Sequence, residues 1–366
     1  MKTNLNNNAM KIRSKRVIKG SMILVAVLLA GCTAIGPPTV ARDRFEYVTA
    51  ISESWKRQTL LNLLKVRYLD APVFLDVSSV INQYVLEGEI ELGFTWQDRN
   101  TQVLSGRGMY TDRPTITYNP LMGEKFAQSL MRPIPISAVL FLIQSGYPAD
   151  YVLRICAQII NGQKNFRSGA LSTQEADPEF YELLDLFHNL QEMDGVSMRY
   201  LLINGKRKIV IFFNPPKNKI AAGNLKRIKQ LLGLDTEVNK FPVVDGSFAL
   251  NNKEIAVLSR SMLQIMIEYA ACIDVPNSDI SEGRVVANKQ YNAERATRFL
   301  PLIRVHNGSS KPDDTFVTVS YRNSWFWIDD KDIYSKAMFQ FLMTLFSFTE
   351  RGESEKGGPV ITVPAN

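Results

Sequence analysis

The stretch V-S-M-R-Y-L-L-I-N-G-K-R-K-I-V-I-F-F, Val196–Phe213, is the part of the chain that decides the fold class. Two runs rich in β-branched and aromatic residues flank the dipeptide Asn204-Gly205. Asn-Gly between two such runs is the strongest short-range signal for a type I′ β-hairpin. We therefore predict that strands Val196–Ile203 and Lys206–Phe213 pair antiparallel.

Helical and strand patterns alternate irregularly on both sides of this hairpin. The predicted helices are Asp43–Tyr68, Asn119–Met131, Ile136–Gln144, Pro148–Asn161, Pro178–Met193, Asn224–Leu232, Ser261–Ile273 and Ile333–Thr349. The other predicted strands are Val73–Trp96, Val103–Tyr118, Phe241–Leu250, Phe299–His306, Thr315–Tyr321, Ser324–Ile328 and Val360–Val363. Hairpins without regular βαβ units indicate an α+β fold with mixed, mostly antiparallel sheets packed against amphipathic and buried helices.

The N-terminal 31 residues have the three parts of a bacterial signal peptide. Six bases and no acid precede Cys32, and Met22–Ala30 is an apolar run that ends in small residues. Nine apolar residues are too few to span a bilayer, which needs about 20 in a helix. Met10 is an alternative start, because Met10–Cys32 is a complete leader by itself.

The sequence Leu29-Ala30-Gly31-Cys32 closely resembles the lipobox of bacterial lipoproteins. This resemblance implies cleavage between Gly31 and Cys32 and lipidation of the Cys32 thiol, so that residues 32–42 become a lipidated tether. Thr33 follows the cysteine where inner-membrane retention typically uses Asp, so the resemblance favours the outer membrane, with the protein facing the periplasm. The membrane, reached through the N-terminal lipid, is then the first expected partner.

Removal of the leader changes the charge balance. The whole chain has 43 Lys and Arg against 36 Asp and Glu, but the mature chain retains 37 bases against the same 36 acids. Its net charge is therefore near zero, and we expect no nucleic-acid partner. A mature chain of 335 residues exceeds the usual size of a single core, and the polar stretch Asn165–Ala176 predicts a boundary between domains 43–165 and 177–366.

Two blocks of like charge are hidden in this balance. Residues 168–198 hold seven acids and no base, whereas residues 206–229 hold eight bases and no acid. One interpretation is internal pairing between the two blocks. The other is an anion-binding surface that faces lipid head groups. The candidate residues for this surface are Lys206, Arg207, Lys208, Lys226, Arg227 and Lys229.

The mature chain has few residues typical of catalysis or metal binding. We predict no catalytic residue, metal site or cofactor, because the chain has only His188 and His306 and lacks metalloprotease, hydrolase, Walker A and dinucleotide motifs. Three glutamates alternate along one predicted strand, and three aspartates precede the last helix. We interpret the first set as a solvated strand face and the second as helix capping. These residues are Glu87, Glu89 and Glu91, and Asp329, Asp330 and Asp332.

Cys156 and Cys272 both lie in apolar stretches that we predict to be helical. A disulfide between them is one interpretation, and two buried thiols, which the apolar context favours, are the other. Trp325 and Trp327 also leave two interpretations. They form either a stacking platform for envelope glycans or part of the packing beneath the last helix, and the second is favoured.

The sequence of the mature chain includes R-D-R-F-E-Y, L-L-N-L-L-K-V-R-Y, Y-T-D-R-P-T-I-T-Y and W-F-W-I-D-D. It resembles a group of uncharacterised Gram-negative lipoproteins, a resemblance that implies no activity. We expect a membrane-anchored envelope lipoprotein that acts as a binding or assembly component, with an envelope protein as a further partner. The alternatives are a membrane-proximal, carboxylate-based hydrolase of envelope glycan or lipid, and an amphiphile carrier.

Overall fold

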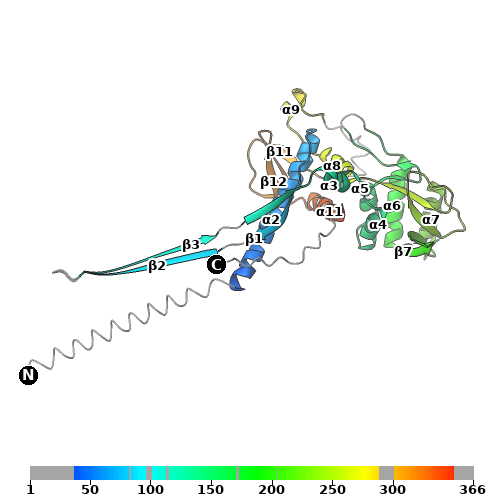
Figure 1. The fold of residues 1–366 in the computed structure, drawn as a ribbon. Helices are drawn as coiled ribbons and strands as arrows, with labels where there is room; N and C mark the ends of the chain where they lie inside the picture. Colours follow the sequence, from blue (N-terminus) through cyan, green and yellow to red (C-terminus); the bar gives the residue numbers. More distant parts are fainter. Residues whose placement is uncertain are drawn as a thin grey trace, which may run out of the picture. The chain divides into compact units, whose positions relative to one another are not determined.

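The computed structural model describes residues 37–81, 84–95, 101–112, 115–169, 173–203, 205–287 and 301–349. The chain divides into two compact units, Met1–Lys56 and Arg57–Asn366. The described residues form nine α-helices, a six-stranded mixed sheet that is mostly antiparallel, and a three-stranded antiparallel sheet (Figure 1). The predicted α+β class is therefore confirmed. Cys32 and Val360–Val363 lie outside the described residues.

The first described helix, α2, spans Pro37–Arg67. The helix that we predicted from Asp43 therefore begins six residues earlier, within the stretch 32–42 that we expect to be the tether. Proline is well suited to the first turn of a helix, because its fixed φ is helical and its missing N–H has no partner there in any case. The part of α2 in the second unit buries Leu60, Leu63 and Leu64 completely.

A two-stranded ribbon follows α2. It consists of β1 (Leu75–Ile81), β2 (Tyr84–Thr95), β3 (Thr101–Asp112) and β4 (Thr115–Pro120), with β1 paired to β4 and β2 paired to β3. Two amides of α2 bind the backbone at and just before its first strand. Asn62 donates to the Val73 carbonyl at 2.8 Å and accepts from its N–H at 2.9 Å, and Gln58 forms the same pair of bonds with Leu75.

The six-stranded sheet has the order β6-β5-β10-β9-β8-β7. Only the β9–β10 pair is parallel. The sheet takes strands from both sides of the polar stretch 165–176 that we predicted as a domain boundary. Its strands are β5 (Ala157–Ile160), β6 (Gln163–Lys164), β7 (Val196–Ile203), β8 (Lys206–Phe213), β9 (Lys240–Asp245) and β10 (Ile255–Ser259). Strand β10 was not predicted.

Most of the helices around this sheet were predicted as helices, but their first and last residues often differ from the prediction. Helix α5 ends at Cys156, so the prediction of one helix over 148–161 is wrong, and Ile159 and Ile160 instead pair in β5 with β10. The predicted helix over 119–131 begins later, at Gly123. The helices are α3 (Gly123–Phe126), the π-helix η2 (Ala127–Met131), α4 (Ile136–Gln144), α5 (Ala149–Cys156), α6 (Pro178–Glu192), α7 (Lys219–Leu231), α8 (Met262–Ala270) and α9 (Asn277–Ser281).

The three-stranded sheet has the order β11-β13-β12 and precedes the last described helix. Its strands are β11 (His306–Gly308), β12 (Thr315–Tyr321) and β13 (Ser324–Asp329), and helix α11 spans Ile333–Thr349. Residues 299–305, predicted as strand, are not strand where described. Phe326 and Ile328 of β13 are fully buried, whereas Trp325 and Trp327 are only half-buried.

Both described cysteines are thiols in buried positions. Cys156 ends α5 and is completely buried, and burial raises the pKa of its thiol to about 12. Cys272 lies just after α8, and its Sγ donates to the Glu268 carbonyl at 3.5 Å. These positions agree with the interpretation of two buried thiols, because a thiol in apolar surroundings stays protonated and packs as a small apolar group.

Candidate binding surface

The β7–β8 hairpin places an apolar tip at the edge of the six-stranded sheet. Strand β7 is the last strand of the sheet, and β8 pairs with β9 on its other side. Leu202 is 74% exposed and Tyr200 53% exposed, although both belong to a regular strand. Leu201 lies between them on the opposite face of the strand and is 37% exposed, and we call the three residues the apolar tip. Exposed apolar side chains that cluster in this way mark an interaction surface more often than isolated ones do.

Cationic side chains lie over aromatic rings on the same hairpin. The Arg207 guanidinium carbon lies 5.2 Å from the Tyr200 ring centroid. Arg199 and Lys240 lie 5.5 and 5.6 Å from the Phe212 ring centroid. A cation above a ring is attracted by about 0.5–1 kcal/mol at an exposed site. The hairpin therefore combines apolar contact area with positive charge.

The bases that we predicted to form an anion-binding surface differ in their exposure and in their ion pairing. Arg207 is exposed, Lys208 is half-buried, and within the described ranges neither forms an ion pair with a carboxylate. Lys226 is exposed on α7. The side chain of Lys206 lies outside the described part of the chain.

Arg227 and Lys229 do not contribute to such a surface. Arg227 donates two hydrogen bonds to the Glu182 carboxylate of α6, at 2.6 and 2.8 Å, and this carboxylate raises the pKa of Arg227. Lys229 is 5% exposed and donates to the Thr236 carbonyl and to Asn239 Oδ1. Lys217 also pairs with an acid, Asp194, at 2.8 Å. Internal pairing thus accounts for part of the basic block, and the hairpin bases stay available.

The sequence did not reveal the apolar half of this surface. We read Tyr200, Leu201 and Leu202 as ordinary strand residues. A usable signal was present, because alternation between apolar and polar residues stops at Y-L-L-I, immediately before the turn. Consecutive apolar residues at the end of a strand near bases indicate exposure when the strand lies at a sheet edge. The edge position itself, however, is a property of the tertiary structure.

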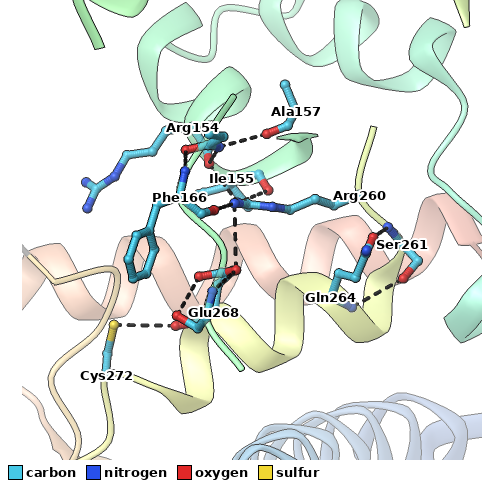
Figure 2. Close-up of polar contacts among 11 residues, drawn as sticks. Arg154, Ile155, Ala157, Phe166, Arg260, Ser261, Gln264, Glu268 and Cys272 are labelled. Atoms are coloured by element: carbon cyan, nitrogen blue, oxygen red, sulfur yellow. Dashed lines mark hydrogen bonds and ion pairs between the residues drawn. The ribbon is translucent and has the colours of Figure 1, made fainter. Parts of the chain in front are cut away.

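A second polar cluster is buried and joins distant segments of the chain (Figure 2). Arg260 is 3% exposed, and its guanidinium donates to the carbonyls of Arg154, Ile155 and Phe166. It also lies 3.7 Å from the carboxylate of Glu268, which is itself 6% exposed. The backbone N–H and the hydroxyl of Ser168 both donate to Glu268 at 2.8 Å. The chain itself occupies these groups, so we interpret this cluster as structural.

The remaining candidate residues lie apart from this cluster and from the hairpin. His188 Nδ1 lies 3.2 Å from Asp150 Oδ1 between α6 and α5, and His306 stacks against Trp327 with ring centroids 5.7 Å apart. Asp332 accepts from the N–H and hydroxyl of Ser335 at the start of α11, which confirms helix capping for this residue. The side chains of Glu87, Glu89 and Glu91 lie outside what the structure describes.

The tryptophans lie on the less buried face of the three-stranded sheet. Because successive strand residues alternate between faces, Trp325 and Trp327 share the face opposite to Phe326. Lys311 Nζ lies 5.9 Å from the Trp325 ring centroid. The fully buried face is therefore the one that carries Phe326 and Ile328, and both interpretations of the half-buried tryptophans stay predictions.

Neither a metal-binding group of side chains nor a membrane-spanning helix is found among the residues that the structure describes. Within these ranges, no three side chains of His, Cys, Asp or Glu are grouped so that they would hold a metal ion. No helix in the described part of the chain has the length and apolar composition needed to cross a bilayer. No protein-family model matches this chain, and neither a curated protein nor a solved structure matches it significantly.

Proposed function

We propose that this protein is an envelope lipoprotein, anchored by lipid on Cys32, that acts as a binding component through its β7–β8 hairpin. The observation that carries the proposal is the exposed tip of Tyr200, Leu201 and Leu202 beside Arg199 and Arg207. Apolar side chains with adjacent bases suit an anionic lipid surface, where the bases meet head groups and the apolar residues enter the interface.

The lipobox supports the first half of the proposal. A cysteine in this context predicts acylation, and two or more acyl chains hold a protein on a membrane far more firmly than one chain does. We expect a palmitate analogue to label the wild-type protein in a Gram-negative host and not to label the Cys32→Ala variant. Equal labelling of both proteins would remove the anchor from the proposal.

The hairpin should bind anionic vesicles without the anchor. A form that lacks the leader and carries Cys32→Ala should sediment with vesicles that contain anionic lipid at 0.05 M salt. It should be released by about 0.5 M salt, since screening shortens the Debye length from about 10 Å at 0.1 M towards 3 Å at 1 M. Replacement of both Arg207 and Lys208 by Glu should weaken binding at least 30-fold, because each base contributes about 1 kcal/mol at such a surface.

A control with the same change of charge separates the hairpin from the protein's overall field. Lys253 and Lys331 are exposed elsewhere, and their double replacement by Glu should weaken binding much less. A second variant, Leu202→Ser, should weaken binding without any change of charge. Equal loss in the hairpin and control variants, or no vesicle binding by the folded wild type at any salt, would contradict the proposed role.

A further inference from the structure

The four strands between residues 75 and 120 behave as one long ribbon. In the β2–β3 pair, residue numbers of opposite partners always add to 196, from Tyr84 opposite Asp112 to Thr95 opposite Thr101. The outer part of the β1–β4 pair has the same register, with Ile81 opposite Thr115. The two pairs therefore continue one another (Figure 1), and the ribbon is rooted on α2 through the amides of Asn62 and Gln58.

The β2–β3 part of the ribbon has two free backbone edges. Among the described residues each strand pairs only with the other, so the outer side of each 12-residue strand has no partner strand. In an antiparallel pair about half of the residues direct both their N–H and C=O groups outward, which is about six residues on each edge. Each edge is therefore a row of donors and acceptors with which no other described strand pairs.

Bulges, proline and lysine, which commonly protect such edges, are missing from these two strands, although β2 carries three glutamates. Natural edge strands are short, bulged, or marked by Pro and Lys. The β2–β3 register has no bulge, whereas the β1–β4 register shifts between Val77 and Ser79. Neither Tyr84–Thr95 nor Thr101–Asp112 contains Pro or Lys. A long and regular edge without a bulge, Pro or Lys favours pairing with another strand.

The sequence of β2 adds a reason for a partner. Positions 86, 90, 92 and 94 are apolar, and positions 87, 89 and 91 are glutamates, so the apolar and acidic residues belong to opposite faces of the ribbon. An isolated two-stranded ribbon is only marginally stable in water. Three or more strands with an apolar face, or packing against a helix, give such a ribbon independent stability, and a further strand can pair at either edge.

We propose that the β2–β3 ribbon is a self-assembly element, and that the β3 edge of one copy of this chain pairs with the β2 edge of the next. A second copy is the partner that fits, because it offers a β2 edge and a β3 edge of equal length. Head-to-tail pairing satisfies both edges of every interior copy, whereas a foreign strand would cover one edge. Arg107, already opposite Glu89, gains a glutamate-rich neighbouring strand by this pairing.

This inference does not depend on the role of the β7–β8 hairpin. Its first test is the particle mass of the full chain in detergent solution, measured by light scattering. The matched control replaces residues 82–114 by Asn-Gly, which joins the paired residues Ile81 and Thr115 with a two-residue turn and keeps the root of the ribbon. We expect the wild type to have the mass of several chains, and the shortened variant the mass of one chain with an unchanged melting curve.

The second test identifies the edges. Glu89→Cys in one chain is oxidised together with Ser105→Cys, Arg107→Cys or Met109→Cys in another, so each chain carries one strand cysteine. We expect a disulfide-linked dimer in at least one of these mixtures and none from Glu89→Cys alone. A wild type with the mass of one chain, a shortened variant that keeps the wild-type mass, or an assembly without any β2–β3 crosslink would overturn the proposal.

Discussion

Replacement of Arg260 by alanine is expected to lower the free energy of unfolding by about 3–5 kcal/mol. The substitution removes the guanidinium donor from the carbonyls of Ile155 and Phe166 and the nearby cation from Glu268, whereas the Arg154 carbonyl keeps its bond from the Asn165 amide. Each buried polar group that loses its partner costs about 1–3 kcal/mol, and a buried charge costs more. Urea unfolding followed by circular dichroism measures this loss.

Two further variants test whether the expected loss of stability is specific to the buried guanidinium of Arg260. Arg284→Ala removes an arginine whose side chain is 52% exposed and pairs with the equally exposed Glu282, so the expected loss is below about 1 kcal/mol. Arg260→Lys keeps the charge but loses the planar fork that reaches several carbonyls, so its expected loss lies between those of the two alanine variants. A loss for Arg260→Ala as small as that for Arg284→Ala would contradict the structural role of the cluster.

Replacement of Phe326 by alanine is expected to cost about 3–5 kcal/mol of unfolding free energy. Phe326 is completely buried in the central strand of the three-stranded sheet, opposite Val319 of β12 and Asn307 of β11. The lost apolar burial and the cavity left behind both contribute to the cost. The same urea measurement applies.

The neighbouring residue provides the control. Trp325 is larger than Phe326 but only half-buried, so we expect Trp325→Ala to cost less than half as much. This order is the reverse of what side-chain size alone suggests. If Trp325→Ala cost as much as Phe326→Ala, the assignment of the two faces of this sheet would be wrong.

Elements with local signals were predicted closely. The hairpin strands Val196–Ile203 and Lys206–Phe213 and the helix Ile333–Thr349 have the predicted bounds. Ser261 and Gln264 form a capping box at the start of α8, where the sequence predicts the helix over 261–273. These signals act between residues that are adjacent or one helical turn apart, so they do not depend on the rest of the fold.

Candidate sites were predicted less well, because burial and pairing belong to the assembled chain. Lys229 and Arg227 have the same sequence signature as exposed bases, yet one is buried against Asn239 and the other pairs with Glu182. The packing of α6 against α7 decides the pairing of Arg227, and the segment after α7 decides the burial of Lys229. The exposed Leu202 likewise follows from the position of β7 at the end of the strand order.

The sequence by itself determined the hairpin, the capping box at Ser261, the α+β class and the lipobox that predicts an anchor, because each of these depends on residues that are close together in the sequence. Only the tertiary structure decided that β10 lies between β5 and β9, that the predicted helix over 148–161 ends at Cys156, and that Arg260 is buried. Strand order and burial depend on contacts between residues about 100 positions apart, such as Arg260 with Ile155. The β-propensity of a short apolar segment such as Ala157–Ile160 is too weak to determine its conformation and its partner strand. Pairing with the neighbouring strand determines both.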